Sequence, residues 1–135
     1  MAEQEPMRKT SLSACEIIYD VLSNDEAIVA KVTKIYPVVE LTEAQCPYIV
    51  YRRTGLSANP QKAGQPGADT VEIEVGCFAT DYEDSVELAE LVREALDYRQ
   101  HVTDDLRMRS CYLSGGSEDY GDDAFVQNLL FTIKI

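Results

Sequence analysis

Apolar residues recur along two segments of the chain with the spacing of a single helical face. In residues 13–23 they follow an i, i+3, i+4, i+7, i+8 pattern, and residues 88–96 repeat it. The pattern predicts two amphipathic helices, the first over 13–23 and the second from Asp84 to about Tyr98. A shorter helical piece is expected over Glu26–Val32.

Both long helices are preceded by residues that can satisfy free backbone N–H groups. Ser13 followed by Glu16 has the spacing of a capping box, in which side chains and backbone bond reciprocally. Asp84 and Glu87 form the corresponding pair in the second helix. We therefore expect these two pairs to mark the helix N-termini.

Other segments alternate apolar and polar residues, which is the period of a half-buried strand. A short extended segment is expected at 34–37, and strands are expected at 47–53, 70–80, 108–113 and 124–135. One-sided helices and one-sided strands together predict an α+β fold. We expect a two-layer sandwich, with two main helices on one face of a mostly antiparallel sheet of four to five strands.

Two stretches follow neither period. Residues 55–69 contain three Gly and two Pro, and a loop of such length in a compact domain is usually functional or disordered. Residues 114–123 are expected to form an acidic turn or loop. Since 135 residues suit a single domain, we interpret residues 1–10 as a flexible N-terminus and 11–135 as one α+β domain.

The charge of the chain restricts its partners. Twenty-four acidic and twelve basic residues give a net charge of −12, which argues against specific nucleic-acid binding. No apolar run is long enough to span a bilayer, and residues 1–10 are not followed by the apolar core of a signal peptide. We therefore expect a soluble protein made in the cytoplasm, without a membrane partner.

The four cysteines are expected to be buried free thiols. None stands in a CxxC pair and the chain has one His, so a zinc site is not expected. Cys15 flanks the first helical stripe, and Cys77 is in phase with apolar residues of a strand. A nucleophilic Cys–His pair would need His101 and an electropositive setting, which an acidic chain does not favour.

Five segments of the chain together carry a family resemblance. They are Ile35–Pro37, Cys46–Tyr51, Val71–Ala79, Leu88–Leu96 and Leu129–Ile133. In this order they resemble the tail-completion (tail-terminator) proteins of long-tailed bacteriophages and their prophage copies. The motifs are strand and helix patterns, so the resemblance concerns fold and assembly and carries over no catalytic residue.

The resemblance extends over about residues 12–135. It implies a small α+β structural subunit without enzymatic activity or cofactors. Such subunits assemble into a ring, usually a hexamer, that caps the tail tube and joins it to the head-neck. The implied partners are further copies of the chain, the tail tube protein and the head–tail connector. The implied location is the virion tail, and the host cytoplasm during assembly.

Candidate functional residues are therefore interface residues. Adjacent strand residues face opposite ways, so only one of Arg52 and Arg53 can serve a contact on a given face. The loop at 55–69 is expected to reach a neighbouring subunit or the tube. The candidates are Arg52, Arg53, Asn59, Gln61, Lys62, Gln65, Glu118, Asp119, Asp122 and Asp123.

Several alternatives remain open. The acidic residues of 118–123 could bind a hard cation, although a solvated acidic turn is favoured. Acidic residues such as Glu72, Glu74 or those of 118–123 could also line the bore of a ring, where they would repel DNA and let it slide through. The alternative function is a non-enzymatic soluble α+β binding module for a small ligand or protein partner. An enzyme would need a pocket with converging polar groups, which the sequence does not indicate.

Overall fold

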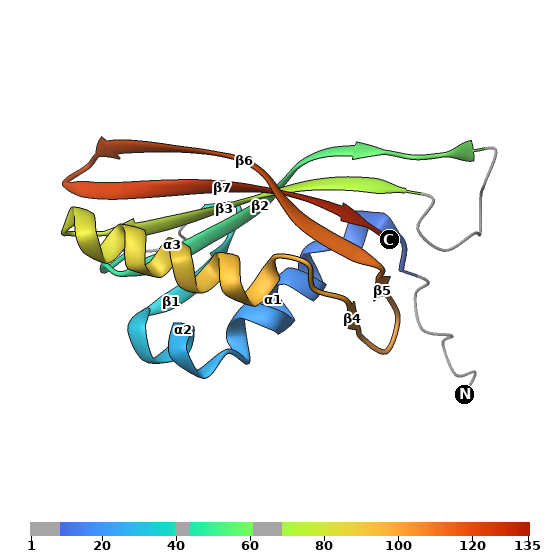
Figure 1. The fold of residues 1–135 in the computed structure, drawn as a ribbon, viewed down its shortest axis with the longest axis horizontal. Helices are drawn as coiled ribbons and strands as arrows, with labels where there is room; N and C mark the ends of the chain where they lie inside the picture. Colours follow the sequence, from blue (N-terminus) through green and yellow to red (C-terminus); the bar gives the residue numbers. More distant parts are fainter. Residues whose placement is uncertain (1–8, 40–43, 61–68) are drawn as a thin grey trace, which may run out of the picture.

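A five-stranded mixed sheet is the centre of the fold (Figure 1). The computed structural model describes residues 9–39, 44–60 and 69–135. In spatial order the strands are β1 (Lys34–Pro37), β2 (Tyr48–Ser57), β3 (Thr70–Ala79), β7 (Ala124–Lys134) and β6 (Ser110–Gly121). β1 pairs parallel with β2, and every other pair in this sheet is antiparallel. The predicted α+β class and mostly antiparallel sheet are confirmed.

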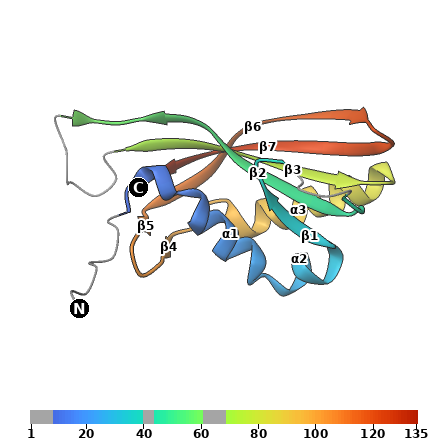
Figure 2. The same cartoon turned by 180° about the vertical axis from the view of Figure 1, so that it is seen from behind.

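The helices lie together on one face of this sheet, as the two opposite views show (Figures 1 and 2). They are the 3₁₀ turn η1 (Ser11–Ser13), α1 (Cys15–Ser23), α2 (Glu26–Lys31) and α3 (Tyr82–Leu96). After α3 the chain forms a small hairpin of β4 (His101–Val102) and β5 (Arg107–Met108). The other face of the sheet, which we call the open face, carries none of these helices.

The core lies between the helices and the sheet. Both predicted helical stripes are buried, with Ile17 and Leu22 of α1 and Leu88 of α3 fully inaccessible. The odd-numbered residues of β3 are buried against them, namely Val71, Ile73, Val75, Cys77 and Ala79. Glu72 and Glu74 alternate with these residues and are therefore on the open face, as the period of two requires.

Both predicted capping boxes are wrong. Thr10 caps η1 by accepting a hydrogen bond from the Leu12 N–H, and Ser13 lies inside this turn rather than at the N-cap of α1. Glu16 instead pairs with Lys9 at 2.9 Å. A 3₁₀ turn runs directly into α1, so the orphan N–H groups that a capping box serves are already bonded within the turn.

At the second helix the expected start is too late by one turn. The N-cap of α3 is Asp81, whose side chain forms no capping hydrogen bond, and Asp84 lies in the first turn. There the Asp84 carboxylate still complements the positive end of the helix dipole. The helix begins earlier because Tyr82 has packing partners on the sheet, where its ring meets Phe125 edge to face.

Residues 55–57 belong to a strand rather than to the loop expected at 55–69. β2 continues through Gly55 to Ser57, after a register shift between Arg53 and Gly55, and remains paired with β3. Residues 1–8 and 61–68 lie outside the described part of the chain. The predictions of a flexible N-terminus and of a loop reaching a neighbour therefore concern residues that the structure mostly does not describe.

The expected acidic loop at 114–123 is also wrong, because most of it belongs to β6. The strand pairs with β7 as far as Gly121–Ala124, and only Asp122 and Asp123 form the turn, at φ of 53° and 61°. Glycines and acidic residues have low strand propensity, but pairing with an apolar neighbour overrides it. The acidic segment is thus the rigid end of a long hairpin.

Candidate interaction surfaces

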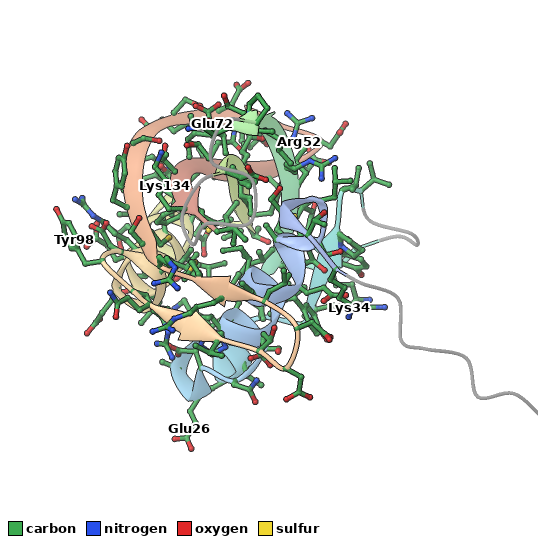
Figure 3. All side chains as sticks on the ribbon, turned by 90° about the vertical axis from the view of Figure 1, so that its right-hand side faces the viewer. Glu26, Lys34, Arg52, Glu72, Tyr98 and Lys134 are labelled. Carbon is green, nitrogen blue, oxygen red and sulfur yellow. The ribbon has the colours of Figure 1, made fainter. Side chains whose placement is uncertain are left out.

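Arg52 and Arg53 lie on opposite sides of β2, as adjacent strand residues must. Arg52 is on the open face, where it forms an ion pair of 3.3 Å with Glu74 of the neighbouring strand. Figure 3 shows Arg52 and Glu72 at the edge of the molecule away from the helical layer, in which Glu26 is labelled. The cross-strand pair leaves both side chains partly exposed and available to a partner.

Arg53 is on the helix side and binds the N-terminal turn. Its Nη1 donates a hydrogen bond of 2.9 Å to the carbonyl of Leu12. The guanidinium therefore satisfies a backbone oxygen of η1 and holds this turn against β2. Of the two arginines, only Arg52 is presented on the open face.

The open face has a small hollow at its centre, about 190 Å³ in volume. Its floor is Gly76, where an added Cβ would lie 3.0 Å from Phe78 Cε2 and 3.2 Å from Asn128 Oδ1. Beside it, the Phe78 ring stacks on Tyr48 at 4.6 Å, and Tyr36 meets Tyr48 edge to face. The volume is below the roughly 300 Å³ at which small-molecule sites begin.

Glu118 joins β6, β7 and the start of α3. Its Oε2 accepts hydrogen bonds from Tyr82 Oη at 2.8 Å and from Gln127 Nε2 at 3.0 Å. The same Nε2 lies 3.3 Å from Ser85 Oγ of α3. The hydrogen bonds from Gln127 and Tyr82 lower the pKa of Glu118, and the bond to Glu118 raises the pKa of Tyr82.

The other acidic candidates do not share the network of Glu118. Asp119 is the next residue of β6 and so is directed to the open face, with Oδ1 accepting a hydrogen bond from the Tyr120 N–H. Asp122 and Asp123 are exposed in the turn. Within residues 9–39, 44–60 and 69–135, no group of three or more His, Cys, Asp and Glu is placed to hold a metal ion.

Aromatic rings and Glu118 line what we call the tip hollow, which has a volume of about 240 Å³. Tyr82, Glu118, Asp119, Tyr120 and Phe125 line it. Phe125 contacts both tyrosines, at 4.8 Å to Tyr120 and 5.7 Å to Tyr82 between ring centroids. Tyr120 is 57% exposed, so the hollow combines apolar rings with a negative rim at the surface.

Asn59 lies near the join of β2, β3 and the N-terminal turn. Its backbone N–H donates to Asp69 Oδ1 at 3.3 Å, while Asp69 Oδ2 accepts from the Ser11 hydroxyl at 2.6 Å. Gln61, Lys62 and Gln65 lie outside the described residues. The sequence reasoning missed Asp69, whose carboxylate connects Asn59 after β2 to Ser11 of η1.

Tyr98, at the other end of α3, was also missed by the sequence reasoning. Its side chain is 84% exposed, yet its backbone adopts a φ of 61°. The Tyr98 N–H donates a hydrogen bond to the carbonyl of Cys111, and this bond holds the Tyr98 backbone in its positive-φ conformation. Hollows of about 460 and 210 Å³ flank the ring. The helix was predicted to run to about Tyr98 but ends at Leu96, so the sequence pattern gave no signal that this tyrosine is exposed outside the helix.

The thiol and imidazole groups are used structurally. His101 Nε2 lies 2.6 Å from Asp20 Oδ2 and so joins β4 to α1. Cys77 and Cys111 are buried, as expected, whereas Cys15 and Cys46 are half-buried. Burial raises the pKa of the Cys77 thiol far above its ordinary value and that of Cys111 to about 12. Neither buried thiol is activated as a nucleophile.

A family model and a solved structure both match this chain. The model of a family described as "Tail completion protein gp17" matches residues 16–135. A chain of a structure titled "Virion of native gene transfer agent (GTA) particle" has a similar fold, with a TM-score of 0.70 at 14% sequence identity. The match covers 88% of this chain and 91% of that one. No curated protein matches. In the described residues, no helix has the length and apolarity needed to cross a membrane.

Proposed function

The chain belongs to the family of tail completion protein gp17, and from this membership we propose that it forms a ring that caps the tail tube and joins it to the head-neck. The family match over residues 16–135 is the observation that carries the proposal. Its role as a structural component of a phage-like tail follows from the family. The ring, the cap and the joint are the parts we propose, with a hexamer as the expected closed form.

The architecture supports a function performed by outer surfaces. One layer of helices covers one face of the sheet, while the open face carries none of these helices. The polar clusters described above are ion pairs and hydrogen bonds between secondary-structure elements, with no nucleophile and base brought together. Such a subunit offers several rigid surfaces to neighbours.

We place the open face towards the bore of the ring. Glu72 and Glu74 are directed to that side, and the chain carries a net charge of −12. Carboxylates along the bore would repel the phosphate backbone and so prevent DNA from adhering as it passes. Replacement of both by glutamine should slow DNA passage in an infection assay, and unchanged passage would contradict this placement.

The tube and the connector are the other proposed partners. The residues Asn59, Gln61, Lys62 and Gln65 are candidate contacts, with the segment expected as a loop at 55–69 reaching the tube or a neighbour.

Deletion of the gene from its phage or prophage tests the proposal. We expect particles in which tails end irregularly and fail to join heads, as seen by electron microscopy, with rescue by the intact gene supplied in trans. In parallel, light scattering should detect an oligomer when purified chain is mixed with purified tail tube. Normal particles from the deletion strain, or a chain that stays monomeric beside the tube, would overturn the proposal.

A further inference from the structure

We propose that copies of the chain join head to tail, with Tyr98 of one copy inserted into the tip hollow of the next. The committed occupant of the hollow is thus a second copy of this chain. The inference rests on the self-assembly proposed above and adds which surfaces meet. It identifies a contact between two different patches, one at each end of α3.

Tyr98 has the properties of an interface anchor. It is 84% exposed, and Figure 3 shows its side chain directed away from the molecule. A tyrosine at a φ of 61° is strained, and such strain persists where the surrounding structure or a function maintains it. Tyrosine is among the residues enriched at binding hot spots, because it buries a large ring at a low entropy cost.

The tip hollow is suited to a single aromatic side chain. Its volume of about 240 Å³ is smaller than typical small-molecule sites. Tyr82, Tyr120 and Phe125 already meet one another at tilted or edge-to-face angles. A further ring can join such a cluster in the offset or edge-to-face geometry that aromatic pairs prefer.

The tip hollow at one end of α3 and part of the surface around Tyr98 at the other end carry opposite charges. Residues 79–86 and 114–126, which form the hollow and its surroundings, contain three and four acidic residues and no Lys or Arg. Residues 98–110 contain three arginines, Arg99, Arg107 and Arg109, against two aspartates. Arg109 lines the smaller hollow beside Tyr98, whereas Glu90, Glu94 and Asp97 line the larger one together with Arg93. The excess of positive charge is therefore on the side of Tyr98 that faces away from α3. Opposite charge around an aromatic anchor selects the partner end and accelerates encounter.

The two patches lie at opposite ends of one rigid element. α3 runs from Tyr82, beside the β6–β7 hairpin, to Leu96, close to Tyr98 (Figure 1). Its fifteen residues span roughly 22 Å at 1.5 Å per residue. A contact between different patches is heterologous, so repetition generates a closed ring or a filament. The hollow of about 210 Å³ beside Tyr98, which Arg109 lines, leaves room for a wall of the neighbour's tip hollow.

Two single variants test the contact by light scattering at concentrations where the wild type assembles. Tyr98→Gly removes the anchor and suits the positive φ, so the fold is retained. Tyr120→Arg blocks the hollow with a charge that repels the arginine-bearing end. Each variant alone should bind itself at least about tenfold more weakly than the wild type. Tyr19→Ala, which alters another exposed tyrosine, is the matched control and should assemble normally.

A mixture of the two variants gives the sharpest result. The Tyr120→Arg chain keeps its anchor and the Tyr98→Gly chain keeps its hollow, so together they should form a one-to-one complex that does not grow further. If the wild type assembles and both variants assemble equally well, the inference is wrong while the proposed ring stands. If the wild type never assembles, even with tail tube, the proposed ring itself is wrong.

Discussion

Tyr82 Oη donates a hydrogen bond of 2.8 Å to Glu118 Oε2, so the first turn of α3 is joined to β6 across 36 positions of sequence. Gln127 of β7 donates to the same oxygen at 3.0 Å. Three elements that meet at one end of the molecule therefore share a single ionised carboxylate. This network fixes the turn end of the β6–β7 hairpin to the helical layer.

The network predicts the titration of Glu118. Because Gln127 and Tyr82 lower its pKa, Gln127→Met and Tyr82→Phe should each raise it toward the ordinary value, with the larger change for Gln127→Met. Carbon-detected NMR titration of the side-chain carboxyl measures both shifts. Tyr120→Phe alters a hydroxyl outside the network and is the control, in which the pKa of Glu118 should not change.

The same pKa shift predicts how this end of the molecule responds to acid. A carboxyl whose folded-state pKa is lowered stabilises the fold above its unfolded pKa, and this contribution disappears as the pH falls through the folded value. Acidification below about pH 4.5 should therefore loosen the contact between α3 and the hairpin. Hydrogen exchange at Tyr120 and its neighbours in β6 measures the effect, and equal protection at pH 7 and pH 3 would contradict it.

The hairpin turn predicts a stabilising substitution. Asp122 and Asp123 both have positive φ, which glycine adopts without steric cost. Asp123→Gly should increase the free energy of unfolding by about 1 kcal/mol in urea denaturation. Asp119→Gly, which places glycine inside β6, should decrease it by about 0.5–1 kcal/mol. Destabilisation of similar size in both variants would show that the turn geometry does not limit stability.

The layers of the fold could be predicted from the sequence because they depend on periodicity. The stripes of α1 and α3 and the alternation of Val71, Ile73 and Val75 record which side of each element is buried. These patterns are local, and burial of the same residues is what stabilises the layers. Predictions of helices, of β3 and of β7 were therefore confirmed.

The errors in strands and surfaces occurred where a distant partner decides the structure. Residues 114–121 have the composition of a loop, and only pairing with β7 makes them a strand. The tip hollow could not be predicted from the sequence pattern either, because Tyr82, Tyr120 and Phe125 come from three elements. The opposite orientations of Arg52 and Arg53 were predictable, whereas their partners Glu74 and Leu12 depend on register and tertiary packing.

The cysteines predict an order of chemical labelling. Cys46 should react first with a thiol reagent at pH 8, because it is only half-buried. Cys15 should be slower since burial raises its pKa, while Cys77 and Cys111 should remain unlabelled in the folded protein. Mass spectrometry of quenched samples gives the order. Labelling of Cys77 in the native state would place β3 outside the core.

The alternation along β3 predicts unequal costs for neighbouring substitutions. Ile73→Ala should decrease the free energy of unfolding by about 2–5 kcal/mol, because it leaves a cavity under the helical layer. Glu72→Ala, one residue away on the open face, should change it by no more than about 0.5 kcal/mol. Urea denaturation measures both values. Comparable losses would mean that the open face is buried in the isolated protein.

Tyr98 predicts a separation between stability and assembly. Glycine relieves the strain of a positive φ and alanine does not, so Tyr98→Gly should be about 1 kcal/mol more stable than Tyr98→Ala. Both variants lack the exposed ring and should lose self-association to the same extent. Urea denaturation of the monomer and light scattering of concentrated samples measure the two properties. If the ring served only the fold, assembly would follow stability, with the glycine variant assembling better than the alanine variant. Equal loss of assembly at unequal stability is the pattern that an interface anchor requires.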